Sequence, residues 1–141
     1  MKKYISWKQY DDYINKITMW YKKHHNEDSL NIGAIYGLPR GGLPIAVSLS
    51  HTLNLPLLMN YYDRKIVTDK KILVVDDIAD TGRTLKDFDN NKNVIITFHY
   101  HKQSIVIPDY FIELKNDDWI VYPWETRDSK EVQDYLKQEE V

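Results

Sequence analysis

Residues 72–84, ILVVDDIADTGRT, decide the fold of this 141-residue chain. Positions 72–75 form a continuous apolar and mostly β-branched run, which is typical of a central parallel strand buried on both faces. We predict that the strand ends at Asp76-Asp77 and that a loop and a short helix from about Arg83 follow. Ligands of open parallel sheets bind outside the carboxyl ends of the strands, so a site is expected at this turn.

Helical and strand patterns alternate on both sides of this run. We predict helices at 7–24 and 43–53, and strands at 32–36, 57–59, 94–98, 110–114 and 119–121. Such alternation implies crossover units, so the expected fold class is α/β, a central parallel sheet with helices on both faces. Residues 1–141 are interpreted as one domain, with a charged tail at about 126–141 that is helical or flexible.

Composition excludes several function classes. The chain has no cysteine, which removes disulfide scaffolds, thiolate zinc sites and thiol nucleophiles. A net charge of -2 argues against a nucleic-acid or membrane partner, and the five histidines show no metal-binding spacing. The N-terminus carries no apolar signal stretch and no run reaches transmembrane length, so we predict a cytoplasmic protein.

The residues after the central strand suit a sugar phosphate with free hydroxyls. Residues 81–84 can present backbone N–H groups and two hydroxyls to a phosphate at a helix start, with Gly82 allowing close approach. The carboxylates of Asp76 and Asp77 suit hydroxyls or a hard cation such as Mg²⁺. The alternative is that both carboxylates only cap the next helix, which leaves the repulsion among three aspartates in five residues uncompensated.

A second loop follows the strand expected at 32–36 and reads GLPRGG over residues 37–42. Arg40 offers a forked set of donors, and Gly41 and Gly42 expose amide groups at a helix start, which suits another phosphate. The alternative is a tight turn with a surface arginine.

Residues 72–84 resemble the phosphoribosyl-pyrophosphate (PRPP) signature of the type I phosphoribosyltransferase family, and residues 36–42 resemble the family's pyrophosphate loop. A response-regulator receiver domain also has an acidic pair after such a strand, but near its N-terminus, and too little chain follows residue 78 here. The resemblance covers roughly residues 4–125 and implies a Rossmann-like fold, PRPP and Mg²⁺ as ligands, and a cis peptide between Pro39 and Arg40.

The resemblance also assigns roles. It gives Asp80 the role of general base for the purine N7 proton and makes Asp77 and Asp76 the metal-binding residues. The residues that it assigns to PRPP are Arg40, Gly41, Asp76, Asp77, Asp80, Thr81, Gly82, Arg83 and Thr84.

Residues 98–104, 108–110 and 118–125 are similar to the 6-oxopurine branch of the family, and most of all to its small xanthine–guanine type. By this resemblance Trp119 stacks on the purine, the Ile120 backbone meets its ring edge, Ile78 packs the opposite face and Lys102 donates to the 6-oxo oxygen. Relatives have a lysine followed by proline at this turn, whereas here the turn is one residue short, so His101 or Tyr100 could take the lysine's role. Ordinary core packing is the alternative for Trp119 and for Trp124.

The expected activity is Mg-dependent transfer of phosphoribose from PRPP to guanine, xanthine or hypoxanthine, releasing pyrophosphate in purine salvage. The alternatives are a non-catalytic PRPP or nucleotide sensor and a transferase for a different base. Residues 59–71, a long mobile hood in many relatives, are short here, which bears on turnover more than on binding. Relatives are commonly dimers or tetramers, so a homo-oligomer is expected.

Overall fold

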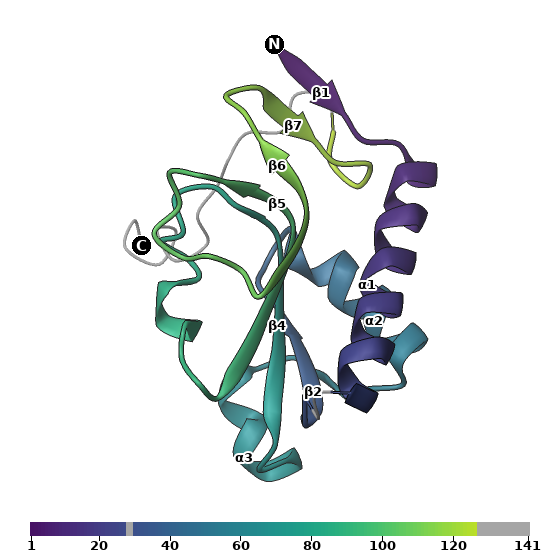
Figure 1. Ribbon diagram of the computed structural model, residues 1–141, viewed down its shortest axis with the longest axis vertical. Coiled ribbons are helices and arrows are strands. Elements are labelled where there is room, and N and C mark those ends of the chain that lie inside the picture. The colour runs from purple at the N-terminus through teal and green to yellow at the C-terminus, as the bar shows by residue number, and fades with distance from the viewer. Residues whose placement is uncertain (28–29, 127–141) are drawn as a thin grey trace.

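The computed structural model describes residues 1–27 and 30–126 as a five-stranded parallel sheet with a small two-stranded sheet at one end (Figure 1). The large sheet has the order β3-β2-β4-β5-β6, and β1 pairs with β7 in parallel. The strands are β1 (Lys2–Tyr4), β2 (Ile32–Gly37), β3 (Leu57–Leu58), β4 (Lys71–Ala79), β5 (Asn93–His101), β6 (Tyr110–Lys115) and β7 (Trp119–Val121). The helices are α1 (Trp7–Glu27), α2 (Gly42–Leu53), η1 (Tyr61–Asp63), α3 (Arg64–Val67) and η2 (Lys86–Phe88).

The long helices form where the sequence signals them. At the start of α1, the Ser6 N–H donates to Gln9 Oε1 at 2.9 Å and the Gln9 N–H donates to Ser6 Oγ at 3.1 Å, a reciprocal cap. Helix α2 ends at Asn54, which adopts the left-handed conformation. The parallel α/β fold and both long helices are therefore confirmed.

The two faces of the sheet are covered differently. Helices α1 and α2 bury one face over a core that includes Leu73, Val75 and Phe98. The other face, with Ile72 and Val74, is covered by the short elements η1 and η2 and by the loop around Val106. Helices thus flank both faces, but those on the second face are only three or four residues long.

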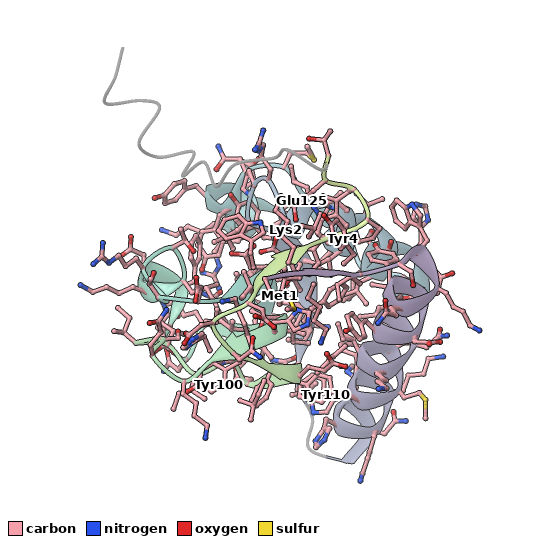
Figure 2. All side chains as sticks on the ribbon, turned by 90° about the horizontal axis from the view of Figure 1, so that it is seen from above. Met1, Lys2, Tyr4, Tyr100, Tyr110 and Glu125 are labelled. Carbon is pink, nitrogen blue, oxygen red and sulfur yellow. The ribbon has the colours of Figure 1, made fainter. Side chains whose placement is uncertain are left out.

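The segment 59–71 packs beside the sheet as η1 and α3. Tyr61 Oη donates to Asn93 Oδ1 at 2.8 Å, at the start of β5, and Thr68 crowds Gly33 near the start of β2. These contacts place the short segment at the end of the sheet where strands begin, at the bottom of Figure 1. The sheet of β1 and β7 lies instead across the upper end, as the view from above in Figure 2 shows. Within residues 1–27 and 30–126, no helix is long and apolar enough to cross a bilayer.

Candidate active site

Asp76 and Asp77 lie inside β4, so the prediction that the strand ends before them is wrong. The pairing of β4 with β5 continues through Asp76↔Thr97 and Ile78↔His99, because this neighbour keeps offering backbone partners. The pairing of β4 with β2 ends at Gly37↔Val75. The acidic pair is therefore carried on a rigid strand extension that has β5 on one side only.

The surroundings of the two carboxyl groups disfavour their ionisation. Burial, and then the neighbouring charge of Asp77, raise the pKa of Asp76 well above its ordinary value. Burial raises the pKa of Asp77 to about 6. Asp76 Oδ1 accepts a hydrogen bond of 2.9 Å from the Asp77 N–H. This bond favours the ionised form of Asp76 and partly offsets the effect of burial on its pKa. A cation bound beside the two carboxyl groups would favour their ionised forms.

These raised pKa values predict that Asp76→Asn stabilises the ligand-free protein. The folded pKa values exceed the unfolded ones, so the pair costs stability above about pH 6 and the cost disappears as the pH falls toward 4. We expect the substitution to raise the free energy of unfolding by about 1–3 kcal/mol near pH 7.5, and by much less near pH 5. Denaturant titration of both proteins at each pH measures this.

The same titrations with Asp87→Asn supply the control, because Asp87 is an exposed carboxylate on η2. His99, whose pKa burial lowers to about 4, contributes equally to all three proteins and cancels in the difference. An equal gain in the free energy of unfolding at both pH values would contradict the raised pKa values assigned to this half-buried pair.

The loop of residues 38–42 packs directly against this pair. The Leu38 N–H donates to the Val75 carbonyl at 3.0 Å, and the peptide between Pro39 and Arg40 is cis, which confirms the prediction. A Cβ placed on Gly41 would lie 2.1 Å from Asp77 Oδ2, so glycine is required by close approach. Arg40 is exposed at the loop's tip. The two loops that the sequence singled out thus share one site.

The loop of residues 81–84 follows β4 directly. Gly82 has φ +82°, and a Cβ there would lie 2.5 Å from Ser104 Oγ, so the loop is pressed against residues 104–106. The Thr81 carbonyl accepts from the Ile105 N–H at 2.9 Å, and Thr81 Oγ1 accepts from the Arg83 N–H at 3.3 Å. Thr81 and Arg83 are exposed, and Thr84 is half-buried.

The prediction of a helix from about Arg83 is wrong. Only the three-residue η2 forms, because the chain turns at Leu85, which is fully buried, and then continues into β5. No dipole of a long helix can therefore assist a phosphate here. Loop amides, the threonine hydroxyls and the Arg83 side chain remain as the donors.

Asp80 stands at the entrance of this loop, one residue after β4. Its Oδ1 accepts from Gln103 Nε2 at 3.0 Å and lies 3.8 Å from Lys115 Nζ. The side chain of Lys115, at the end of β6, is only 11% exposed. Sequence reasoning missed Lys115, although its place one residue beyond the strand expected at 110–114 was a usable signal.

The residues assigned to the purine come only partly together. Ile120 and Lys115 border a cavity of about 50 Å³, which is also lined by Lys3, His99, Leu114 and Asn116. Trp119 in β7 is 39% exposed, Ile78 in β4 is half-buried, and Lys102 is exposed in the turn after β5. Trp124 stacks on Tyr122 with ring centroids 5.0 Å apart, which is core packing.

Two further groups adjoin the acidic pair. Tyr122 Oη donates to the Asp77 carbonyl at 3.2 Å, and the charge of Glu125 adds to the factors that raise the pKa of Asp77. Both residues come from the segment after β7. In the view from above, Glu125 lies on the same side of the molecule as Lys2 and Tyr4 of β1 (Figure 2). Sequence reasoning missed them because neither lies in a loop that follows a strand of the large sheet.

The donor set fits Mg²⁺ shared with a substrate. Among residues 1–27 and 30–126, no three carboxylate or imidazole side chains are grouped as a metal site made by protein alone. Mg²⁺ is commonly held by one or two carboxylates together with substrate phosphate oxygens, and the pair Asp76 and Asp77 supplies that number.

Comparison with known proteins adds to this geometry. No family model matches the sequence. A purine phosphoribosyltransferase from Pyrococcus horikoshii superposes with a TM-score of 0.70 at 27% identity, over 93% of this chain and 99% of that one. The xanthine-guanine-hypoxanthine phosphoribosyltransferase of Helicobacter pylori gives 0.70 at 17% identity, over 100% of both chains.

A hypothetical protein from Neisseria gonorrhoeae with bound ppGpp gives 0.60 at 21% identity, over 91% of each chain. The five-stranded parallel sheet agrees with the likeness to the first two structures. The chain therefore has the fold of the purine phosphoribosyltransferases and is similar to the P. horikoshii enzyme over nearly its whole length.

Proposed function

We propose that the protein transfers the phosphoribosyl group of PRPP to a 6-oxopurine, releases pyrophosphate and forms the nucleoside 5′-monophosphate, as in purine salvage. The observation that carries this proposal is the contact between Asp77 and Gly41, which joins the acidic pair to the 38–42 loop. The 81–84 loop follows the acidic pair along the chain. Two loops and the acidic pair between them provide one position for each phosphate group and one for the ribose of a diphosphorylated sugar.

The parts of PRPP are assigned as follows. Arg40 and the amides of residues 41–42 bind the pyrophosphate, and residues 81–84 bind the 5′-phosphate. Asp76 and Asp77 accept hydrogen bonds from the ribose hydroxyls and would hold Mg²⁺. When bound, Mg²⁺ neutralises charge on the departing pyrophosphate.

The reaction demands little covalent work from the protein. The bond between ribose C1 and the pyrophosphate oxygen breaks as a ring nitrogen of the purine bonds to that carbon, through an oxocarbenium-like ribose. Asp80 accepts the proton that leaves purine N7, and Gln103 and Lys115 hold its carboxylate in place. The Lys115 ammonium group places a positive charge 3.8 Å from this carboxylate.

The purine is placed between the end of β4 and β7. Trp119 stacks on one face, Ile78 packs against the other, and the Ile120 main chain meets the ring edge. Lys102 donates to the 6-oxo group, which favours oxo over amino purines. The exposed position of Trp119 leaves its ring available for stacking, and this supports its role over core packing.

The surroundings of the enzyme are also part of the proposal. We propose a cytoplasmic protein that acts as a homo-oligomer, a dimer or a tetramer. The side chains of Ile105 and Ile107 are 62% and 69% exposed, which is compatible with a contact between copies of the chain. Analytical ultracentrifugation at micromolar concentration tests this, and a single monomeric species would contradict it.

A sensor that binds PRPP or a nucleotide without turnover is the second candidate. The N. gonorrhoeae protein with bound ppGpp has the same fold, which favours a nucleotide ligand. The presence of Asp80 with its two partners favours catalysis instead.

One assay separates these functions and the choice of base. The protein is incubated with PRPP and Mg²⁺ against hypoxanthine, guanine, xanthine, adenine, uracil and orotate, and nucleoside monophosphate is measured by chromatography. We expect product with at least one 6-oxopurine and none with adenine, uracil or orotate. PRPP binding with no product from any base would favour the sensor, and product with another base alone would reassign the substrate.

A further inference from the structure

His99 and Tyr122 make a buried polar contact that the proposed reaction does not use. His99 lies in β5 with 0% exposure, and Tyr122 follows β7 with 3% exposure. His99 Nδ1 and Tyr122 Oη are 2.8 Å apart. One of these two atoms must donate to the other, so the order of protons along this contact can be worked out.

The hydrogen bonds of Tyr122 determine which atom carries each proton. Its hydroxyl also lies 3.2 Å from the main-chain oxygen of Asp77, and a carbonyl can only accept. The tyrosine hydroxyl has a single proton to donate. Tyr122 therefore donates to Asp77, and His99 must carry its proton on Nδ1 and donate to Tyr122.

Both rings are held from several elements. His99 Nε2 faces Glu113 Oε2 at 3.5 Å without a hydrogen bond between them. This carboxylate oxygen accepts from Tyr13 Oη at 3.1 Å and from Lys3 Nζ at 3.4 Å. The Tyr122 ring stacks on Trp124 with an interplanar angle of 3°. The hydroxyl of Tyr122 consequently has a position fixed by contacts with β5 and with the segment after β7.

Strand β4 needs such a tie at Asp77. Its pairing with β2 ends at Val75, so residues 76–79 have a partner strand on one side only. The carboxylate of Asp77 is in contact with Gly41, with no room for a methyl group between them. A small displacement of the strand at this residue would change the distance between the acidic pair and the pyrophosphate loop.

We propose that Tyr122, held by His99, is a positioning residue that fixes Asp77 for the binding of PRPP with Mg²⁺. This inference rests on the proposed function for the identity of the ligand. It does not require turnover, because its primary readout is the affinity for PRPP.

Tyr122→Phe keeps the ring and removes the tie. We expect the affinity for PRPP with Mg²⁺, measured by calorimetry, to fall about 5- to 30-fold, because a buried carbonyl and a buried imidazole N–H lose their partner. The KM for the purine should change by less than about twofold, since the purine does not contact Asp77. Tyr13→Phe is the matched control, because it removes a hydroxyl from the far end of the same cluster and should leave PRPP affinity unchanged.

His99 is tested by a pair of substitutions. In His99→Asn the amide Nδ2–H can still donate to Tyr122, whereas His99→Leu offers no donor. We expect affinity near that of the wild type for the first and a loss similar to that of Tyr122→Phe for the second. A merely structural role would lower stability in both Phe variants without separating PRPP from purine.

The outcomes are distinguishable. A folded Tyr122→Phe protein that binds PRPP with Mg²⁺ as tightly as the wild type overturns the positioning role and leaves the proposed function intact. Wild-type binding of PRPP without turnover refutes the proposed transfer but still allows the positioning role to be tested. A wild-type protein that does not bind PRPP refutes both.

Discussion

Asp80→Asn is expected to lower kcat about 10²–10⁴-fold while PRPP affinity stays within about twofold of the wild type. The amide keeps the size of the side chain and its Oδ1 can still accept from Gln103, so the loop should retain its structure. It cannot take a proton from the purine, which is the role proposed for the carboxylate. Steady-state kinetics with saturating PRPP, together with calorimetry of PRPP binding, measures both quantities.

Asp87→Asn is the control for this variant. Asp87 is an exposed carboxylate seven positions further along the same segment, and its neutralisation changes the net charge by the same amount. Turnover near the wild-type value in Asp80→Asn would remove Asp80 from the mechanism. An equal loss in both variants would point to net charge instead.

Gly41→Ala should lower kcat/KM for PRPP by about 10²-fold, since misplacing binding groups by about 1 Å can cost that much. The added methyl group would lie 2.1 Å from Asp77 Oδ2 and 2.5 Å from its Cγ, so either the loop or the carboxylate must move. Either movement separates the pyrophosphate donors from the acidic pair. Initial rates at varied PRPP concentration measure this loss.

Gly33→Ala provides a steric control at the other end of β2. A Cβ there would lie 2.2 Å from Thr68 Oγ1, an overlap of similar size that is far along the chain from the acidic pair. We expect this variant to lose stability but to keep its KM for PRPP. If Gly41→Ala retained wild-type kcat/KM, the contact between the loop and Asp77 would have no role in binding.

The sequence was informative where local pattern and function coincide. The apolar run at 72–75 predicted the central strand, and the glycine-rich loop after β2 was correctly paired with the acidic residues. The cis peptide between Pro39 and Arg40 followed from the family resemblance and is present. These features are encoded within short segments, so they can be read without knowledge of the tertiary structure.

Other features depend on contacts between distant segments. β4 extends to Ala79 because β5 continues to pair with it. The two consecutive aspartates had indicated that the strand ends there, because aspartate is disfavoured in strands. The helix expected from about Arg83 is reduced to the three residues of η2, although Leu85 is buried as its apolar character indicates. Lys115 and Tyr122 reach the site from β6 and from the segment after β7, and such approaches cannot be derived from spacing along the chain.

The residues assigned to the purine were also predicted only in part. Trp119 and Ile120 were placed in a strand that exists, and its parallel pairing with β1 brings Lys3 beside them. That N-terminal strand has only three residues and was not predicted, because a strand of this length depends on its partner for stability. The assignment of Lys102 to the 6-oxo group stays a prediction, and its exposed turn gives the side chain freedom to reach a bound base.

Titration of the wild-type protein with PRPP tests the central claim most directly. We expect calorimetry near pH 7.5 to show binding that requires Mg²⁺. The affinity should weaken toward pH 5, because the pKa of Asp77 is raised to about 6 and its protonation removes a negative charge from the site. A folded protein that takes up no PRPP in the presence of Mg²⁺ near pH 7.5 would contradict the account.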